Sequence, residues 1–212
     1  STCAVADLVF GMLISLYRNV IPCDKVCREE GTKDGLVGFE LEGKTFGVVG
    51  TGAIGLRVAA IAQAFGCRVL AYSRTAKEVP GIRYVDLETL LAECDVVSLH
   101  TPLTEETRGL MNEERIGLMK KNAVLINTAR GPVVDSDALA KALKEGRIAG
   151  ACIDVFENEP PVRKDHPLFL APNTIVTPHV AFATREALVK RAVIVFDNVV
   201  NYLDGTPKNV IG

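Results

Sequence analysis

The sequence lacks three features that would each point to a class of function. Its 24 lysines and arginines nearly balance 26 aspartates and glutamates, for a net charge of −2. Without a basic patch, neither a nucleic acid nor a membrane is expected as a partner. The apolar run at residues 8–16 is too short to cross a bilayer. It also lacks the basic leader and cleavage site of a targeting segment.

The cysteines show no pattern of a disulfide or metal centre. There are six, without a Cys-x-x-Cys pair, and most lie in apolar runs. Buried thiols of a cytoplasmic protein are therefore expected. Cys23 and Cys27 could share a helix face, but a metal site would need further ligands nearby. The sequence thus predicts no metal site.

Short β-rich runs alternate with helical patterns along most of the chain. Strands are predicted near residues 45–49, 68–72, 95–100, 123–127, 150–155 and 174–177, and helices at 5–18, 53–65, 86–93, 112–119 and 136–145. This alternation is typical of an α/β fold with a doubly wound parallel sheet, a Rossmann-type domain with helices on both faces. We assign residues 1–183 to this dinucleotide-binding domain.

A last helix is predicted over residues 184–203, with Leu188, Val195 and Tyr202 on one apolar stripe. Residues 184–212 are interpreted as a C-terminal helix whose stripe needs a partner surface. Because Ser1 leads directly into a helical pattern, further native sequence is expected upstream.

Gly50, Gly52 and Gly55 form a Gly-x-Gly-x-x-Gly motif between a predicted strand and a predicted helix. This is the context that a dinucleotide-binding loop requires. Gly50 would permit the tight turn, Gly52 the approach of a pyrophosphate, and Gly55 close helix–strand packing. The helix N-terminus would offer free N–H groups to the phosphates. The motif predicts a site for NAD or NADP.

The residues after the second predicted strand bear on the choice of cofactor. An acid there would bind the 2′-hydroxyl of the adenosine ribose, but the sequence has Ser73 and Arg74, with no carboxylate until Glu78. Ser73 and Arg74, aided by Lys77, could accept a 2′-phosphate. Arg74 stacked on adenine would instead leave NAD as the cofactor. Both remain open, and the pattern favours NADP.

Arg130, Glu159 and His179 lie after predicted strands, at the sheet edge where open α/β folds bind ligands. A guanidinium can hold a carboxylate through two parallel hydrogen bonds, and an imidazole can move a proton near neutral pH. A carboxylate beside the imidazole would orient it and raise its pKa. Together with the glycine loop, these residues predict hydride transfer on a small hydroxy or oxo acid. By contrast, His166 is expected to be a solvated loop residue, and His100 a structural residue with a backbone partner.

Five motifs resemble the D-isomer-specific 2-hydroxyacid dehydrogenase family. They are VVGTGAIG, HTPLTEETRGL, INTARGPVVD, GACIDVFENEPP and TPHVA, in this order. The resemblance implies NAD(P)-dependent interconversion of a D-2-hydroxy acid, such as glycerate or phosphoglycerate, with a 2-oxo acid such as hydroxypyruvate. It implies Arg130 as the substrate-binding arginine and His179 as the acid–base. Glu159, rather than Glu157, is implied as the partner of His179.

The resemblance also implies where the cofactor, a second subunit and a further domain would lie. Asp154 is implied at the nicotinamide carboxamide, and the first helix with its loop at a homodimer interface. The family has a substrate domain before the first helix, on which the C-terminal helix of residues 184–212 would pack. This chain alone is therefore expected to be inactive. The motifs and the resemblance together predict these cofactor-binding residues: Gly50, Gly52, Ala53, Ile54, Gly55, Ser73, Arg74, Thr101, Pro102, Thr107, Thr128, Ala129, Arg130, Asp154, His179 and Ala181.

A rival interpretation is an NAD(H)-sensing binding protein similar to the carboxyl-terminal binding protein corepressors, which resemble the family and keep the same three residues. The sequence has no basic cluster of the nuclear-targeting kind. Formate dehydrogenase, another branch of the family, is disfavoured. That branch is expected to have a Gln-x-x-Gly-His arrangement at the histidine, whereas here Val176-Thr177-Pro178 precedes His179.

Overall fold

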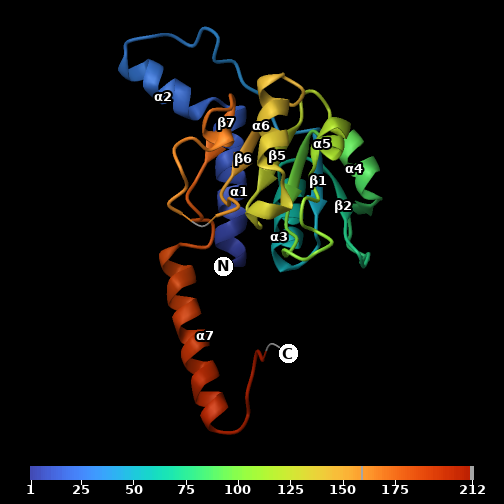
Figure 1. Cartoon of the computed structure of the whole chain (residues 1–212), viewed down its shortest axis with the longest axis vertical. Coiled ribbons are helices and arrows are strands. Elements are labelled where there is room, and N and C mark those ends of the chain that lie inside the picture. The colour runs from blue at the N-terminus through green and yellow to red at the C-terminus, as the bar shows by residue number, and fades with distance from the viewer. Residues whose placement is uncertain (159, 211–212) are drawn as a thin grey trace.

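A seven-stranded parallel sheet forms the centre of the protein in a computed structural model that describes residues 1–158 and 160–210 (Figure 1). The spatial order is β3-β2-β1-β4-β5-β6-β7, so the winding direction changes between β1 and β4. Such a switch point is where open α/β sheets bind ligands. The doubly wound Rossmann-type fold is confirmed. The strands are β1 (Thr45–Val49), β2 (Arg68–Tyr72), β3 (Ile82–Tyr84), β4 (Val96–Leu99), β5 (Val124–Asn127), β6 (Gly150–Ile153) and β7 (Thr174–Val176).

Helices cover both faces of the sheet. α1 and α3 pack in one apolar cluster, and α4, α5 and α6 pack in the other. Strand β5 shows why both clusters form: Leu125 enters one, and Val124 and Ile126 enter the other. Successive side chains of a strand point to opposite faces, so a strand buried on both sides reads as a continuous apolar run. The helices are α1 (Thr2–Tyr17), α2 (Val20–Arg28), α3 (Ala53–Ala64), α4 (Leu87–Glu93), α5 (Glu113–Leu118), α6 (Ser136–Lys144) and α7 (Arg185–Leu203), with short 3₁₀ turns η1 (Gly131–Val133) and η2 (Pro167–Phe169).

Two elements were not predicted from the sequence. Helix α2 has no buried residue, so no apolar face marks it. Strand β3 has only three residues, at the edge of the sheet. Helix α6 begins at Ser136, as predicted, and Asp135 is its N-cap, because its carboxylate accepts a hydrogen bond from the amide of Ala138.

Three cysteines, Cys67, Cys94 and Cys152, are buried thiols, and the other three are not buried. Burial raises the pKa of Cys67 to about 11, which keeps that thiol protonated near neutral pH. Among the described residues, no group of three or more metal-binding side chains comes together.

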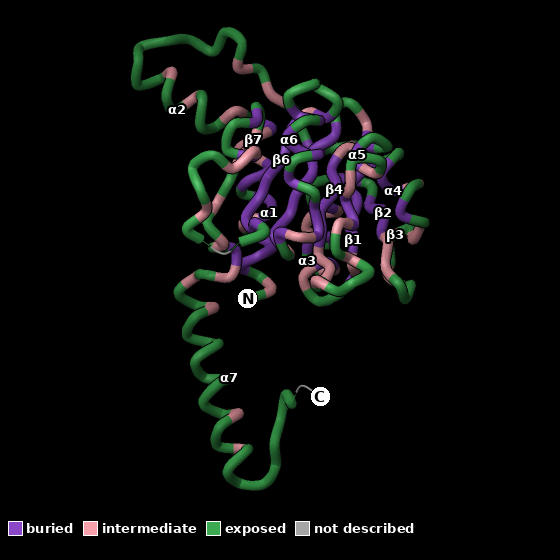
Figure 2. The backbone as a smooth tube through the Cα atoms, in the orientation of Figure 1, coloured by how far each residue is buried: buried purple, intermediate pink, exposed green. Residues whose placement is uncertain are grey.

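Helix α7 extends away from the α/β body (Figure 1), and Figure 2 shows it exposed along its length. None of its residues is buried in this chain, and its apolar residues include Phe196 and Leu203, which are 70% and 77% exposed. No single helix of the described chain meets the length and hydropathy needed to cross a membrane. Helices α1 and α2 do so only as a pair bent by 56°, and α1 is largely buried.

Candidate active site

The glycine loop joins β1 to α3, and its three glycines meet different surroundings. Gly50 has a φ of 97°, and a Cβ there would lie 2.7 Å from the His100 carbonyl oxygen. A Cβ on Gly55 would lie 1.9 Å from the Gly50 carbonyl oxygen. Gly52, the N-cap of α3, is exposed and has open space where a Cβ would be. Gly50 and Gly55 therefore shape the turn, whereas Gly52 leaves room in front of the helix N-terminus.

A cavity of about 230 Å³ opens beside this loop. It lies between the loops that follow β1, β2 and β4, at the winding switch of the sheet. A larger cavity of about 540 Å³ lies at the opposite end of the sheet, near Tyr17 and Phe65, away from the predicted site residues. The smaller cavity is thus the better ligand site. Its lining brings together the sequence-predicted residues Gly50, Gly52, Ser73, Arg74, Thr101, Pro102 and Thr107.

Buried hydroxyl groups surround the same edge. Among the described residues, four side-chain oxygens are buried without a hydrogen-bond partner, those of Thr51, Thr101, Thr128 and, on β3, Tyr84. Each threonine follows the end of a strand, β1, β4 or β5 respectively. Leaving a buried polar group unpaired costs about 1–3 kcal/mol. Three such groups lie at this one sheet edge, where a polar ligand could pair with them.

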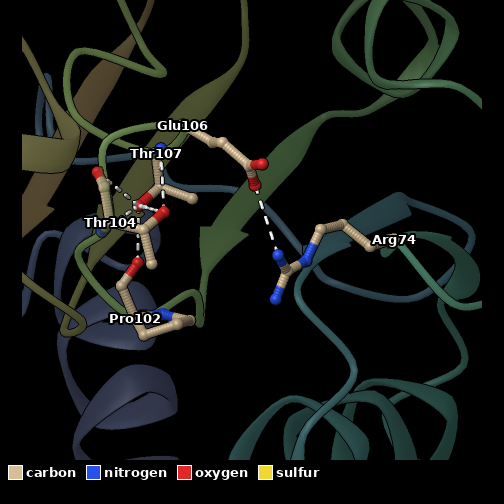
Figure 3. Close-up of polar contacts among 5 residues, drawn as sticks. All are labelled: Arg74, Pro102, Thr104, Glu106 and Thr107. Atoms are coloured by element: carbon tan, nitrogen blue, oxygen red, sulfur yellow. Dashed lines mark hydrogen bonds and ion pairs between the residues drawn. The ribbon is translucent and has the colours of Figure 1, made fainter.

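The loop after β4 faces the loop after β2 across this cavity (Figure 3). Arg74 Nη1 lies 3.2 Å from Glu106 Oε2, an ion pair between two exposed side chains. Thr107 donates a hydrogen bond to the Pro102 carbonyl at 2.6 Å and accepts one from the Thr104 amide at 2.8 Å. Thr107 therefore folds its own loop. Glu106 could not be found from local sequence patterns, because the residue it pairs with is 32 positions away.

His100 lies at the end of β4 and contacts Ser98 rather than the expected backbone partner, with 2.9 Å between His100 Nε2 and the Ser98 hydroxyl. Ser98 is fully buried. Burial lowers the pKa of His100 to about 4, so its imidazole is neutral near pH 7.

The neutral His100 predicts an acid-sensitive fold. Unfolded, this imidazole would take up a proton near pH 6.5, whereas in the folded chain it resists protonation down to about pH 4. The unfolded state therefore binds more protons in this window, and stability falls as pH drops through it. His100→Asn should remove about 2 kcal/mol of the stability difference between pH 7.5 and 5. Urea unfolding of both proteins at the two pH values measures this stability difference, and a difference that His100→Asn leaves unchanged would contradict a neutral, largely buried imidazole.

Arg130 follows β5, and its guanidinium is on the surface. Asn127 fixes the local backbone, since its amide donates to the Arg130 carbonyl at 2.9 Å and accepts from the Ala129 amide at 3.0 Å. A Cβ on Gly131 would lie 1.9 Å from backbone atoms of Phe156, so glycine allows the loops after β5 and β6 to touch. Arg130 Nη1 donates to the Ala129 carbonyl at 2.6 Å.

His179 lies in the loop after β7, and Asp154, after β6, holds that loop. The fully buried Asp154 carboxylate accepts hydrogen bonds from the amides of Val180 and Ala181, both at 2.9 Å, and from the Thr177 hydroxyl. The His179 amide donates to the Asp154 carbonyl at 2.7 Å. These bonds hold His179 at a φ of 57°, a conformation that non-glycine residues seldom adopt. The His179 ring packs edge-on against Phe182, with centroids 5.6 Å apart.

Glu159, predicted as the partner of His179, lies outside the described residues. Glu157 is paired with a different imidazole, since its carboxylate lies 3.0 Å from His166 Nε2. Burial would raise the pKa of Glu157, but hydrogen bonds with Ser136 and His166 outweigh it and hold the pKa below its ordinary value.

The prediction that His166 is a solvated loop residue is wrong. Its side chain is only 13% exposed, because the loop folds its ring against Phe156 and Phe169. His166 Nδ1 also accepts a hydrogen bond from the Leu168 amide at 3.3 Å, at the start of η2. His166 and Glu157 therefore brace the loop after β6.

The remaining sequence-predicted residues lie along the same edge. Ala53 and Ile54 form the first turn of α3, Ala129 precedes Arg130, and Ala181 is buried after His179. Because β5, β6 and β7 are neighbours in the sheet, the loops carrying Arg130, Asp154 and His179 end side by side.

Comparisons with known proteins agree with this geometry. Residues 10–181 match the family described as D-isomer specific 2-hydroxyacid dehydrogenase, NAD binding domain. A glyoxylate reductase of Thermococcus litoralis is 44% identical over an alignment that covers 99% of this chain and 67% of that protein. The chain thus spans about two-thirds of that relative's length.

Two solved structures are also similar. An acyclic imino acid reductase in complex with NADPH and D-Arg superposes with a TM-score of 0.91 at 36% identity, covering 99% of this chain and 67% of that one. A D-lactate dehydrogenase from Aquifex aeolicus complexed with NAD and lactic acid gives 0.90 at 36% identity, covering 97% and 68%.

Proposed function

Because this chain belongs to the D-isomer-specific 2-hydroxyacid dehydrogenase family, we propose that it is the cofactor-binding part of an NAD(P)-dependent oxidoreductase. Its substrate would be a small D-2-hydroxy acid or the corresponding 2-oxo acid. The observation that carries the proposal is the set of three unpaired threonine hydroxyls beside the glycine loop, on the sheet edge that also presents Arg130 and His179.

The residues present fit a dinucleotide. The open space at Gly52 and the N-terminus of α3 suit a pyrophosphate. The hydroxyls of Thr51, Thr101 and Thr128 would gain partners from the polar atoms of the cofactor. A bound nicotinamide would supply the hydride for reduction of a 2-oxo acid or accept it in the reverse direction.

Arg130 and His179 would handle the substrate. The exposed guanidinium can bind a carboxylate through two parallel hydrogen bonds, with its backbone fixed by Asn127. The His179 imidazole would give a proton to the carbonyl oxygen during reduction and take it from the hydroxyl during oxidation. We propose Glu159 as its carboxylate partner on the family resemblance, and the pairing of Glu157 with His166 supports that choice.

An enzyme is favoured over the corepressor-like alternative by the relatives. The Thermococcus litoralis protein is named for glyoxylate and the Aquifex aeolicus structure holds lactic acid, which are a small 2-oxo acid and a small 2-hydroxy acid. Substrates of this size suit a site that grips one carboxylate, so we propose a short-chain 2-oxo acid.

A homodimer is proposed as the assembly. Helix α2 and the segment after it project from the body, as Figure 1 shows, and expose the apolar side chains of Ile21, Val37 and Phe39. Exposed apolar surface of this kind is typical of an interface.

The 212-residue chain should bind NADH or NADPH but reduce glyoxylate, pyruvate or hydroxypyruvate poorly. Its cofactor cradle is complete, but Arg130 is exposed to water, where a single contact with a small acid is strongly screened. Cofactor fluorescence on titration measures binding, and absorbance at the nicotinamide band measures turnover. Gly52→Val is the control, because the free protein has space for the side chain but the pyrophosphate would lose its place.

Failure of both reduced cofactors to bind would refute the proposed function. Binding that Gly52→Val leaves unchanged would place the dinucleotide elsewhere. Turnover at ordinary enzyme rates, roughly 1–1000 per second, would show that the exposed site is already sufficient for catalysis.

A further inference from the structure

The ion pair between Arg74 and Glu106 spans the cavity that the proposed function assigns to the dinucleotide (Figure 3). Arg74 follows β2 and Glu106 lies in the loop after β4. Both side chains line the cavity and are 77% and 70% exposed. The pair is therefore accessible to a ligand that enters between the two loops.

The position of Arg74 matters because NAD and NADP differ by one phosphate, on the ribose that the residues after β2 approach in this fold. Ser73 and Arg74 supply a hydroxyl and a guanidinium that suit a phosphate. In this protein, however, the guanidinium is already 3.2 Å from a carboxylate. A 2′-phosphate held by Arg74 would have to displace that carboxylate or lie close to another negative charge.

The loop around Glu106 is tied in place. Next to it, Thr107 is bonded to the Pro102 carbonyl at 2.6 Å and to the Thr104 amide at 2.8 Å. On the other wall, Lys77 Nζ donates to the Thr51 carbonyl at 2.9 Å and so ties the loop after β2 to the glycine loop. With both loops anchored, the backbone keeps the Glu106 carboxylate within reach of Arg74 across the cavity.

We propose that Glu106 is a specificity-determining residue, which weakens the binding of NADPH relative to NADH by occupying and neutralising Arg74. The inference rests on the proposed function, because it requires this cavity to bind NAD(P). It also changes the interpretation of Ser73 and Arg74, since a pattern that favours NADP in the sequence is opposed by an acid from a distant loop.

Glu106→Gln tests the proposal, with Glu105→Gln as a matched control that removes the same charge from the neighbouring exposed residue. The readout is the ratio of the NADPH to the NADH dissociation constant, from fluorescence titrations of the 212-residue chain. Glu106→Gln should lower the ratio about three- to fivefold, as expected for an exposed charge close to a phosphate. Glu105→Gln should change it by less than about twofold.

Two further measurements separate a contact through Arg74 from a general charge effect. In an Arg74→Gln background, Glu106→Gln should change the ratio by less than about twofold. The effect should also shrink in high salt, because the screening length falls from about 10 Å at 0.1 M to about 3 Å at 1 M.

A ratio that Glu106→Gln leaves unchanged, or that Glu105→Gln changes equally, would overturn the proposal while leaving the proposed function intact. A full effect in the absence of Arg74 would also overturn it. If the unmodified chain binds neither cofactor, the proposed function and this inference both fail.

Discussion

Replacing His179 by glutamine is expected to slow 2-oxo acid reduction by roughly 10²- to 10⁴-fold, the usual contribution of a positioned acid or base. This decrease in rate is expected in whichever length of the protein reduces the 2-oxo acid. Glutamine can hydrogen-bond but cannot deliver a proton near neutral pH. Dinucleotide affinity should change much less, because the glycine loop and the cavity between the loops after β1, β2 and β4 are left intact.

His166→Gln is the matched control, since that imidazole also packs against aromatic rings and is paired with Glu157, as His179 is proposed to pair with Glu159. It should lower the stability of the loop after β6 but keep the turnover rate within a few-fold. Steady-state kinetics with a saturating reduced cofactor give both values. A His179→Gln enzyme within tenfold of the unmodified rate would remove His179 from the role of acid–base.

Much of the fold could be predicted because its signals are local. The strands Thr45–Val49 and Arg68–Tyr72 were predicted with their observed bounds, since each buried run ends at a glycine or polar segment. By contrast, α2 follows Asn19, whose φ of 50° breaks the chain direction, and packs no residue into the core. Neither feature produces a periodic apolar pattern in the sequence from which the helix could be predicted.

The candidate site could be predicted only in its outline. The glycine motif and the positions of Arg130 and His179 after strands are visible in short stretches of sequence. The residues that support them are not, because Asp154 and Ala181 are 27 residues apart and Arg74 and Glu106 are 32 apart. His166 was mistaken for a solvated residue for the same reason, since its burial depends on how a loop folds against η2.

The Asp154 contacts lead to the prediction that Asp154→Asn will both destabilise the chain and reduce turnover. The carboxylate accepts from two backbone amides through different oxygens, at 2.9 Å each. Asparagine keeps one oxygen, so its amino group would face a buried N–H donor. The amino group and the backbone N–H would then face each other without an acceptor at a fully buried position, which should cost about 3 kcal/mol or more. Urea unfolding measures this loss.

The same substitution tests whether Asp154 positions His179 or merely stabilises the fold. If it positions the loop, amide hydrogen exchange at Val180 and Ala181 should accelerate well beyond that of the sheet, and turnover should fall more than cofactor affinity. Asp86→Asn is the control, because Asp86 is an exposed N-cap that bonds the Thr89 amide, and asparagine caps helices about as well. Equal protection at Val180 and Ala181 in both variants would show that Asp154 does not hold the loop. Because the Asp154 bonds surround the left-handed backbone of His179, the position of the proposed proton donor then depends on the Asp154 carboxylate.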